Sequence, residues 1–212
     1  MAIDKLASMI TILDYGVGNL RSVELAFNHL GYSPRITADP GLISQADFLV
    51  VPGQGAFAEA IKNLNQLGLT DIIKSHITSN KPYLGICLGF QILFESSEEN
   101  GAHQGLRIFK GSVKKFTKPG LKVPHMGWNE IALKNDPNNV FQDLAMPAHV
   151  YFAHSYYVTT PDDAIISTET SYGDSFVSSV QRPNLLGIQF HPEKSGDIGL
   201  ALLKNFTKQV LS

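Results

Sequence analysis

The sequence predicts an α/β fold in which a mostly parallel central sheet is flanked by helices. Through the first half of the chain, apolar runs rich in branched residues alternate with segments of helical period, as they do in βα units. The 212 residues, 43% of them hydrophobic, are enough to bury one sizeable core. No repeat, low-complexity segment or linker divides them, so we expect residues 1–212 to form a single domain.

The first half of the chain contains predicted strands that are each followed by helical sequence. The segment NLRSVELAFNHLGY, residues 19–32, has apolar residues at helical spacing, with Asn19 as a candidate N-cap and Gly31 as the residue that ends the helix. The predicted strands are 9–13, 47–51 and 82–86, and the predicted helices are 19–32, 57–64 and 70–77.

The second half changes character, because short β-like runs are separated there by Pro, Asn, Asp and Gly. We expect these runs to be antiparallel additions to the sheet. A final amphipathic helix has Ile198, Leu202, Phe206 and Val210 in register. The β-like runs cover residues 111–116, 129–133, 149–158, 164–169, 176–180 and 185–190.

Composition and charge argue against several classes of protein. The formal net charge is −2, and no run rich in Lys and Arg offers the positive surface that nucleic-acid binding needs. One cysteine cannot form an intramolecular disulfide, and the first residues lack the basic start and apolar core of a secretion signal. No apolar run approaches the ~20 residues that span a bilayer. We therefore expect a cytoplasmic protein that binds neither nucleic acid nor membrane.

Cys87, the only cysteine, lies between two glycines in GICLGFQ, where a predicted buried strand meets a helix. Gly85 and Gly89 leave room for a sharp turn of the nucleophile-elbow type, which lifts the side chain above the sheet. The N-terminus of the following helix would favour the thiolate. A small buried core residue is the alternative, since free cysteine is often buried. The strand-turn-helix context favours a nucleophile.

A cysteine nucleophile needs a base and a group that orients the base. In GIQFHPEKS, His191 follows a β-like run and Glu193 comes two residues later. Residues i and i+2 of an extended chain face the same way, so we expect Glu193 to hold the His191 ring; a surface turn is the alternative. No tight spacing of His and Cys predicts a metal site. We expect His29, His76 and His103 to lie on solvated faces.

The third element is VVPGQGAF, residues 50–57, at the end of another predicted strand. Acyl transfer from a thiolate creates an oxyanion, which N–H groups of a glycine-rich turn can stabilise. Gly53 and Gly55 permit the conformations that this needs, although an ordinary strand-ending turn has the same composition. DYGVGN, residues 14–19, begins like a dinucleotide fingerprint, but Arg21 stands where the third glycine belongs. We therefore expect no cofactor.

PGQGAF, GICLGFQ and HPEKS, in this order and at these separations, resemble the motifs of the class I (triad-type) glutamine amidotransferases. The resemblance covers nearly the whole chain and implies a flavodoxin-like fold and hydrolysis of glutamine to glutamate and ammonia. It implies Cys87 as nucleophile, His191 as general base and acid, and Glu193 as the orienting residue. The implied oxyanion donors lie at Leu88 and in the turn of Gly53, Gln54 and Gly55, and the implied glutamine-binding residues are Gly55, Gln91, Glu99, Ser155 and Tyr156.

DYGVGNLRSV, PHMGWNEI and HSYYV resemble one branch of this family, the glutaminase subunits of histidine biosynthesis, which deliver ammonia to a barrel-shaped cyclase subunit. The chain departs from the usual pattern at Gln54, where a small apolar residue is more common, and at Ser155, where threonine is frequent. Trp128 could alternatively be a core residue. The residues that the resemblance places against the cyclase are Asn19, His125, Met126, Trp128, Asn129 and Lys194.

Other functions stay open at this point. The glutaminase of another synthase, for pyridoxal phosphate or purines, would lack the PHMGWN motif. A catalytically silent regulatory subunit would have lost a member of the triad. A cysteine hydrolase or peptidase of similar architecture would not need Gln91 and Glu99.

Overall fold

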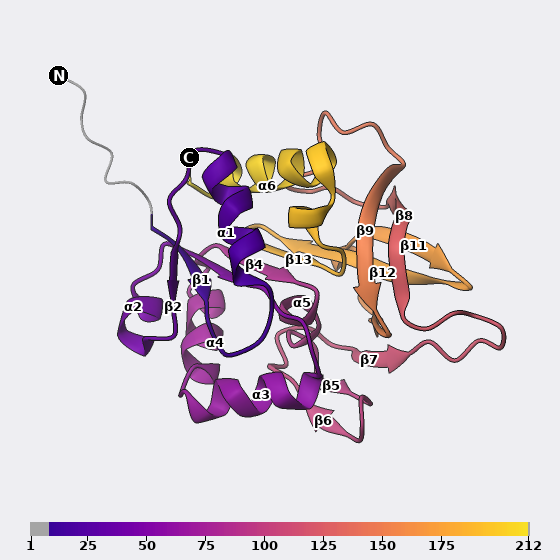
Figure 1. The fold of residues 1–212 in the computed structure, drawn as a ribbon, viewed down its shortest axis with the longest axis horizontal. Coiled ribbons are helices and arrows are strands. Elements are labelled where there is room, and N and C mark those ends of the chain that lie inside the picture. Colours follow the sequence, from indigo (N-terminus) through magenta and orange to yellow (C-terminus); the bar gives the residue numbers. More distant parts are fainter. Residues whose placement is uncertain (1–8, 212) are drawn as a thin grey trace.

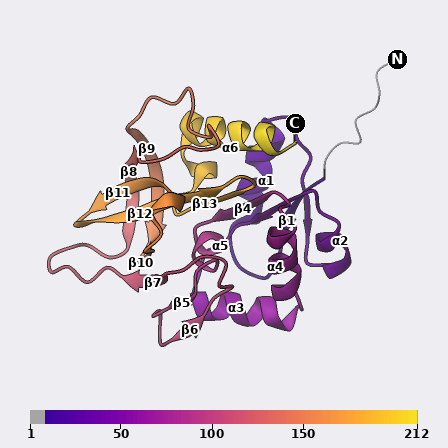
Figure 2. The same cartoon turned by 180° about the vertical axis from the view of Figure 1, so that it is seen from behind.

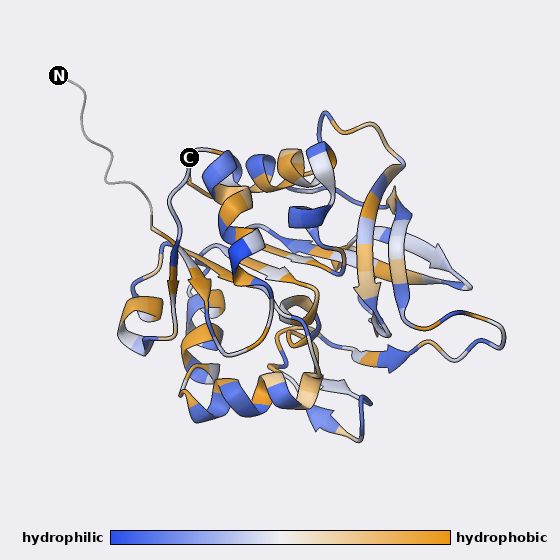
Figure 3. Ribbon diagram, in the orientation of Figure 1, coloured by the Kyte–Doolittle hydropathy of each residue, from blue (hydrophilic) through white to orange (hydrophobic). Residues whose placement is uncertain are grey.

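The computed structural model describes residues 9–211, and a 13-stranded sheet forms the centre of the molecule (Figure 1). Its parallel part comprises β1 (Ile10–Leu13), β2 (Arg35–Thr37), β3 (Phe48–Val51), β4 (Tyr83–Ile86) and β13 (Leu185–Ile188). All of these except β2 are buried along their whole length. Burial on both faces explains why these segments are continuous apolar runs in the sequence. Figure 3 shows hydrophobic residues concentrated in these strands.

Helices cover both faces of the parallel strands. On one face, Phe48 of β3 packs edge-to-face between Phe27 and Phe206, at centroid distances of 6.1 and 5.6 Å. These two rings belong to α1 (Leu20–His29) and α6 (Gly196–Leu211). The opposite face is covered by α2 (Pro40–Ser44), α3 (Phe57–Gln66), α4 (Thr70–Thr78) and the short α5 (Leu88–Gln91).

The second half of the chain extends the sheet with mostly antiparallel strands (Figure 2). They are β5 (Ser96–Ser97), β6 (His103–Gln104), β7 (Ser112–Lys115), β8 (His125–Leu133), β9 (Ala148–His154), β10 (Tyr156–Thr159), β11 (Ile166–Tyr172) and β12 (Asp174–Arg182). The strand order is β2-β1-β3-β4-β13-β12-β10-β7-β5-β6, with β11, β8 and β9 off this path. The 3-10 helices are η1 (Asp163–Ile165) and η2 (Pro192–Lys194).

The predicted fold class is confirmed, and so are both ends of α1. The Asn19 side chain accepts a hydrogen bond from Ser22 N–H at 3.3 Å, and Gly31 has a φ of +86°. Within residues 9–211, no helix combines the length and apolar character that crossing a membrane requires.

Several expectations about individual elements were wrong. The run 185–190 was expected to be an antiparallel addition, but β13 pairs parallel with β4 and antiparallel only with β12. His76 was expected on a solvated face, yet it is 4% exposed and its Nε2 lies 2.8 Å from the Pro82 carbonyl oxygen. The reason is its position on α4, one turn after the buried Ile73, on the face that packs inward.

Candidate active site

Cys87 lies at the sharp junction of β4 and α5. Its backbone has φ 53° and ψ −104°, a conformation that residues with a side chain rarely adopt. Its N–H donates to the Ile188 carbonyl at 2.7 Å. A Cβ on Gly85 would lie 2.5 Å from the Gly89 carbonyl oxygen, and one on Gly89 would overlap the Val51 carbonyl oxygen. Both glycines are therefore required by close backbone contacts, and these contacts hold the cysteine in its strained turn.

His191 and Glu193 form a buried pair beyond the end of β13. His191 Nδ1 lies 2.9 Å from Glu193 Oε1, and the two side chains are 2% and 3% exposed. The expected pairing is present, but the expected extended backbone is wrong, because Pro192–Lys194 is a 3-10 helix. Among the described residues, His191 Nε2 has no hydrogen-bond partner. Cys87 is nevertheless close enough to His191 to stabilise a proton on the ring.

The pKa of His191 is raised to about 10. Burial alone would lower it, but the neighbouring Cys87 and Glu193 stabilise the imidazolium and outweigh the burial. The arrangement therefore favours the protonated imidazole of His191, with Glu193 behind the ring.

Gln189 is a neighbour of the thiol that the sequence analysis missed. It is fully buried, and its Nε2 donates to Cys87 Sγ at 3.5 Å, while its Oε1 accepts from Gln91 Nε2 at 3.0 Å. The signal in the sequence is one polar residue inside the apolar run LLGIQF. A buried amide of this kind needs polar partners, and here it joins the thiol to Gln91.

The glycine turn after β3 does not present the expected set of oxyanion donors. Leu88 N–H donates to the Gly53 carbonyl oxygen at 3.4 Å. One of the predicted oxyanion donors is therefore already hydrogen-bonded within the protein. Gly55 has a φ of +118°, which only glycine adopts readily, and a Cβ there would meet no atom within 4 Å. Gly53 is required for a different reason: a Cβ there would lie 2.5 Å from Tyr15 Oη and 2.7 Å from Leu88 Cβ.

A cavity of about 410 Å³ opens beside Cys87. Gln91 Nε2 donates to the Tyr156 carbonyl at 3.0 Å, and Glu99 Oε2 accepts from Phe57 N–H at 2.8 Å, at the start of α3. The volume suits a small molecule. All of the expected glutamine-binding residues line the cavity: Gly55, Gln91, Glu99, Ser155 and Tyr156.

The expected partner-contacting residues divide into exposed and buried ones. Met126 and Trp128 on β8 are 64% and 58% exposed, which excludes the interpretation of Trp128 as a core residue. Asn19 and Lys194 are also exposed, and Asn129 is half-buried. His125 is only 3% exposed, so the expectation that its side chain contacts a partner is wrong. It points to the inner face of β8, because alternate residues of a strand face opposite ways.

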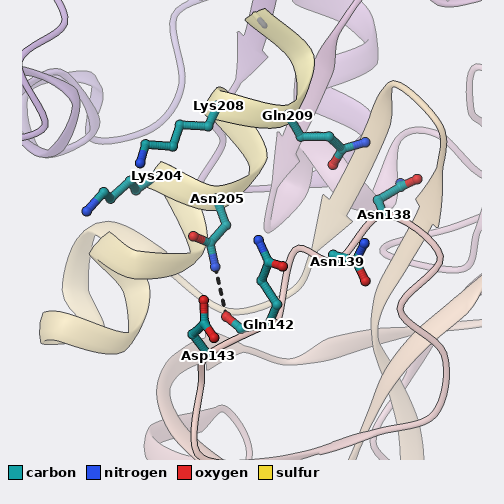
Figure 4. Close-up of a pocket in the computed structure, with 8 residues that line it drawn as sticks. All are labelled: Asn138, Asn139, Gln142, Asp143, Lys204, Asn205, Lys208 and Gln209. Atoms are coloured by element: carbon teal, nitrogen blue, oxygen red, sulfur yellow. Dashed lines mark hydrogen bonds between the residues drawn. The ribbon is translucent and has the colours of Figure 1, made fainter.

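A second hollow lies between α6 and the loop before β9 (Figure 4). Every residue in its lining is polar, and Asn205 Nδ2 already donates to the Val140 and Gln142 carbonyls at 3.1 and 3.0 Å. It offers no reactive group of the kind found beside Cys87. Within residues 9–211, no cluster of three or more His, Cys, Asp or Glu side chains could hold a metal ion.

Comparisons with known proteins point to one family. The family model "Glutamine amidotransferase class-I" matches residues 3–210. The chain is 49% identical to the imidazole glycerol phosphate synthase subunit HisH of Syntrophotalea carbinolica, covering 93% of this chain and 98% of that one. It is 46% identical to the HisH subunit of Aquifex aeolicus, covering 93% and 95%.

A longer relative is similar over part of its length, and solved structures share the fold. The chloroplastic imidazole glycerol phosphate synthase hisHF of Arabidopsis thaliana is 46% identical over 94% of this chain and 34% of its own length. A putative GMP synthase subunit from Thermoplasma acidophilum has a similar fold, with a TM-score of 0.71 at 22% identity over 95% of this chain and 93% of that one. A glutamine amidotransferase from Thermotoga maritima gives 0.67 at 15% identity, over 97% and 99%.

Proposed function

We propose, because the chain belongs to the class I glutamine amidotransferase family, that it is the glutaminase subunit of an imidazole glycerol phosphate synthase in histidine biosynthesis. The observation that carries the proposal is Cys87 on its strained turn, beside a buried His191–Glu193 pair and at a small-molecule cavity. We further propose a cytoplasmic enzyme of one domain, residues 1–212, that works without a cofactor.

The reaction needs a nucleophile and a group that moves a proton. The Cys87 thiolate attacks the side-chain amide carbon of glutamine, and the C–N bond breaks as His191 Nε2 gives its proton to the departing nitrogen. Ammonia leaves, and a thioester to Cys87 remains. His191 then takes a proton from water, whose oxygen attacks the thioester, so that glutamate is released and the thiolate is restored. Glu193 keeps the imidazole in position throughout.

The cavity provides charges suited to an amino acid. Among the described residues that line it, Glu99 has the only carboxylate and Lys194 the only ammonium group. The α-ammonium group of glutamine would be stabilised near Glu99, which leaves the side-chain amide to reach toward Cys87. Gln91, Ser155 and Tyr156 complete the proposed glutamine site.

The turn of Gly53, Gln54 and Gly55, which we call the oxyanion turn, is the proposed gate of the reaction: its conformation decides whether glutamine hydrolysis is fast or slow. In this structure the Gly53 carbonyl accepts from Leu88 N–H. A half-turn of the Gly53–Gln54 peptide would replace that carbonyl by Gln54 N–H and leave two N–H groups for the oxyanion. Loss of one such donor costs about 10²- to 10³-fold in rate, so the isolated protein should be a poor glutaminase.

The proposed partner is a barrel-shaped cyclase subunit, which receives the ammonia and forms imidazole glycerol phosphate and AICAR. The names of the relatives support this, since they are subunits and the Arabidopsis thaliana protein is called hisHF. The exposed Met126 and Trp128 give β8 an apolar surface for a heterodimer contact. Asn19, Asn129 and Lys194 would lie around it.

Steady-state glutaminase assays test the proposal. We expect slow turnover by the isolated protein and fast turnover when the cyclase, with its nucleotide ligand, is present. Equal rates in all states would contradict the gate, but not the triad. Cys87→Ser should abolish ammonia release while the circular dichroism spectrum stays unchanged. Undiminished activity of that variant would contradict the proposed nucleophile.

A further inference from the structure

The hydroxyl of Tyr15 is buried without a partner. Tyr15 lies in the loop between β1 and α1 and is 1% exposed, and among the described residues its Oη makes no hydrogen bond. The same hydrophobic cluster contains Tyr83, whose Oη donates to the Gly89 carbonyl at 2.8 Å. A buried hydroxyl without a partner destabilises a protein relative to phenylalanine, so the Tyr15 hydroxyl calls for another explanation.

The Tyr15 hydroxyl lies directly against the oxyanion turn. A Cβ on Gly53 would be 2.5 Å from Tyr15 Oη. The same loop contacts the turn again at Gly18, where a Cβ would be 3.2 Å from Gly53 Cα and 3.5 Å from Gln54 N. The loop therefore packs on the peptide that joins Gly53 to Gln54.

The Tyr15 hydroxyl is also a reliable hydrogen-bond donor. Burial, and to a lesser degree the nearby Cys87, raises the pKa of Tyr15 well above its usual value. The side chain therefore stays protonated over the whole range in which the enzyme works. It can donate a hydrogen bond to a carbonyl that comes within reach.

We propose that Tyr15 is a positioning residue that holds the oxyanion turn in its active orientation, an inference that rests on the function proposed above. When the Gly53–Gln54 peptide turns, the Gly53 oxygen leaves Leu88 N–H and needs a new donor. A carbonyl oxygen lies about 2.4 Å from the Cα of its own residue. As the peptide turns, the Gly53 oxygen therefore stays close to Gly53 Cα, where the Tyr15 hydroxyl can reach it. The Tyr15 hydroxyl donates to the turned carbonyl.

This contact exists in only one of the two states. A group can shift the equilibrium between two states only if it interacts more favourably with one of them. In the resting state the hydroxyl is unpaired and the carbonyl is bonded to Leu88. In the active state the hydroxyl bonds the carbonyl, and Leu88 N–H is free for the oxyanion. The active state thereby recovers the hydrogen bond that the carbonyl loses.

Tyr15→Phe tests the proposal because it removes only the hydroxyl oxygen. The resting protein loses no hydrogen bond, so the melting temperature of the isolated protein should stay the same or rise. With the cyclase and its nucleotide ligand bound, kcat for glutamine hydrolysis should fall about tenfold while KM for glutamine is unchanged. A purely structural role would not lower kcat in a protein that is equally stable.

Tyr83→Phe is the matched control, because it removes a bonded hydroxyl from the same hydrophobic cluster and should lower the melting temperature. A wild-type kcat in Tyr15→Phe would overturn the inference. So would a melting temperature lowered as in Tyr83→Phe, because the hydroxyl would then have a partner in the resting state. If the wild-type complex itself releases no ammonia from glutamine, the proposed function fails instead.

Discussion

Lowering the pH from 7 to 5 should destabilise the protein through the buried pair of His125 and His154. His154 Nδ1 lies 2.7 Å from the Tyr156 carbonyl oxygen, which can only accept, so this nitrogen carries the proton. His154 Nε2 then accepts from His125 Nδ1 at 2.9 Å, and His125 Nε2 accepts from Asn129 Nδ2 at 3.2 Å. Every ring nitrogen has a partner only while both rings are neutral.

The magnitude follows from the pKa values of the pair. Burial lowers the pKa of His125 to about 4 and that of His154 to about 3, against about 6.5 in the unfolded chain. Between pH 6.5 and pH 4 the unfolded state therefore binds more protons, so stability falls as the pH falls. Each histidine should cost about 2 kcal/mol between pH 7 and pH 5, and the pair about 4 kcal/mol.

This loss is a large fraction of a typical free energy of unfolding, which is about 5–15 kcal/mol. His191 opposes only a small part of it, about 1 kcal/mol between pH 7 and pH 5. Its pKa is raised to about 10, so it stays protonated in the folded state while the unfolded histidine finishes gaining its proton. The stability that His191 contributes is fully present below about pH 6 and is lost as the pH rises from there toward 10.

Urea unfolding at pH 7 and pH 5 measures the effect. In His154→Asn, the amide nitrogen can keep the bond to the Tyr156 carbonyl, but one titrating ring is gone. The loss of stability between the two pH values should be smaller by about 2 kcal/mol in this variant. His29→Asn, which removes an exposed ring on α1, should leave the loss unchanged. The same loss in wild type and His154→Asn would refute the assignment of a neutral pair.

Three other predictions concern the catalytic pair, the elbow and the exposed face of β8. Glu193→Ala should retain measurable glutaminase activity, because the carboxylate only orients the ring, and its kcat should exceed that of His191→Ala by roughly tenfold or more. Gly89→Ala should lower stability by more than about 3 kcal/mol, seen as a fall in melting temperature, because its Cβ would overlap the Val51 carbonyl. Trp128→Ala should weaken binding to the cyclase by at least about tenfold in titration calorimetry, and an unchanged affinity would place the interface elsewhere.

The elements that could be predicted from the sequence are those whose local pattern is sufficient to specify them. The apolar run ahead of Cys87 and the helical spacing of Leu20, Val23 and Phe27 are examples. β2 and α2 were missed because they are only 3 and 5 residues long, too short for a period to show. The direction of β13 was mistaken because strand pairing is a tertiary property. β13 is buried along its whole length, as parallel strands typically are. The prediction grouped it with the other short β-like runs of the second half and so assigned it the same antiparallel direction.

The same distinction between local sequence pattern and tertiary structure applies to the candidate active site. The motifs identify the residues, and the structure brings Cys87, His191 and Glu193 into one place. The backbone between His191 and Glu193 could not be predicted, because proline is compatible both with an extended chain and with the first turn of a helix. Gln189 was missed because its partners, Cys87 and Gln91, are distant in the sequence. The choice of partner for a buried polar group depends on the assembled fold.

The packing around Gly53 explains why a switch would be located in this turn and not in the elbow. A Cβ on Gly53 would lie 2.5 Å from Tyr15 Oη and 2.7 Å from Leu88 Cβ, so the turn is closely packed on that side. The hydrogen bond from Leu88 N–H to the Gly53 carbonyl, however, is 3.4 Å long, against about 2.9 Å for a strong bond. A closely packed glycine with a weakly held carbonyl allows one peptide to rotate while its surroundings stay in place. Cys87 has no comparable freedom, because its N–H donates to Ile188 of β13 at 2.7 Å and the nearby Gly89 packs on the Val51 carbonyl of β3. The nucleophile can therefore stay in position while the oxyanion donors change.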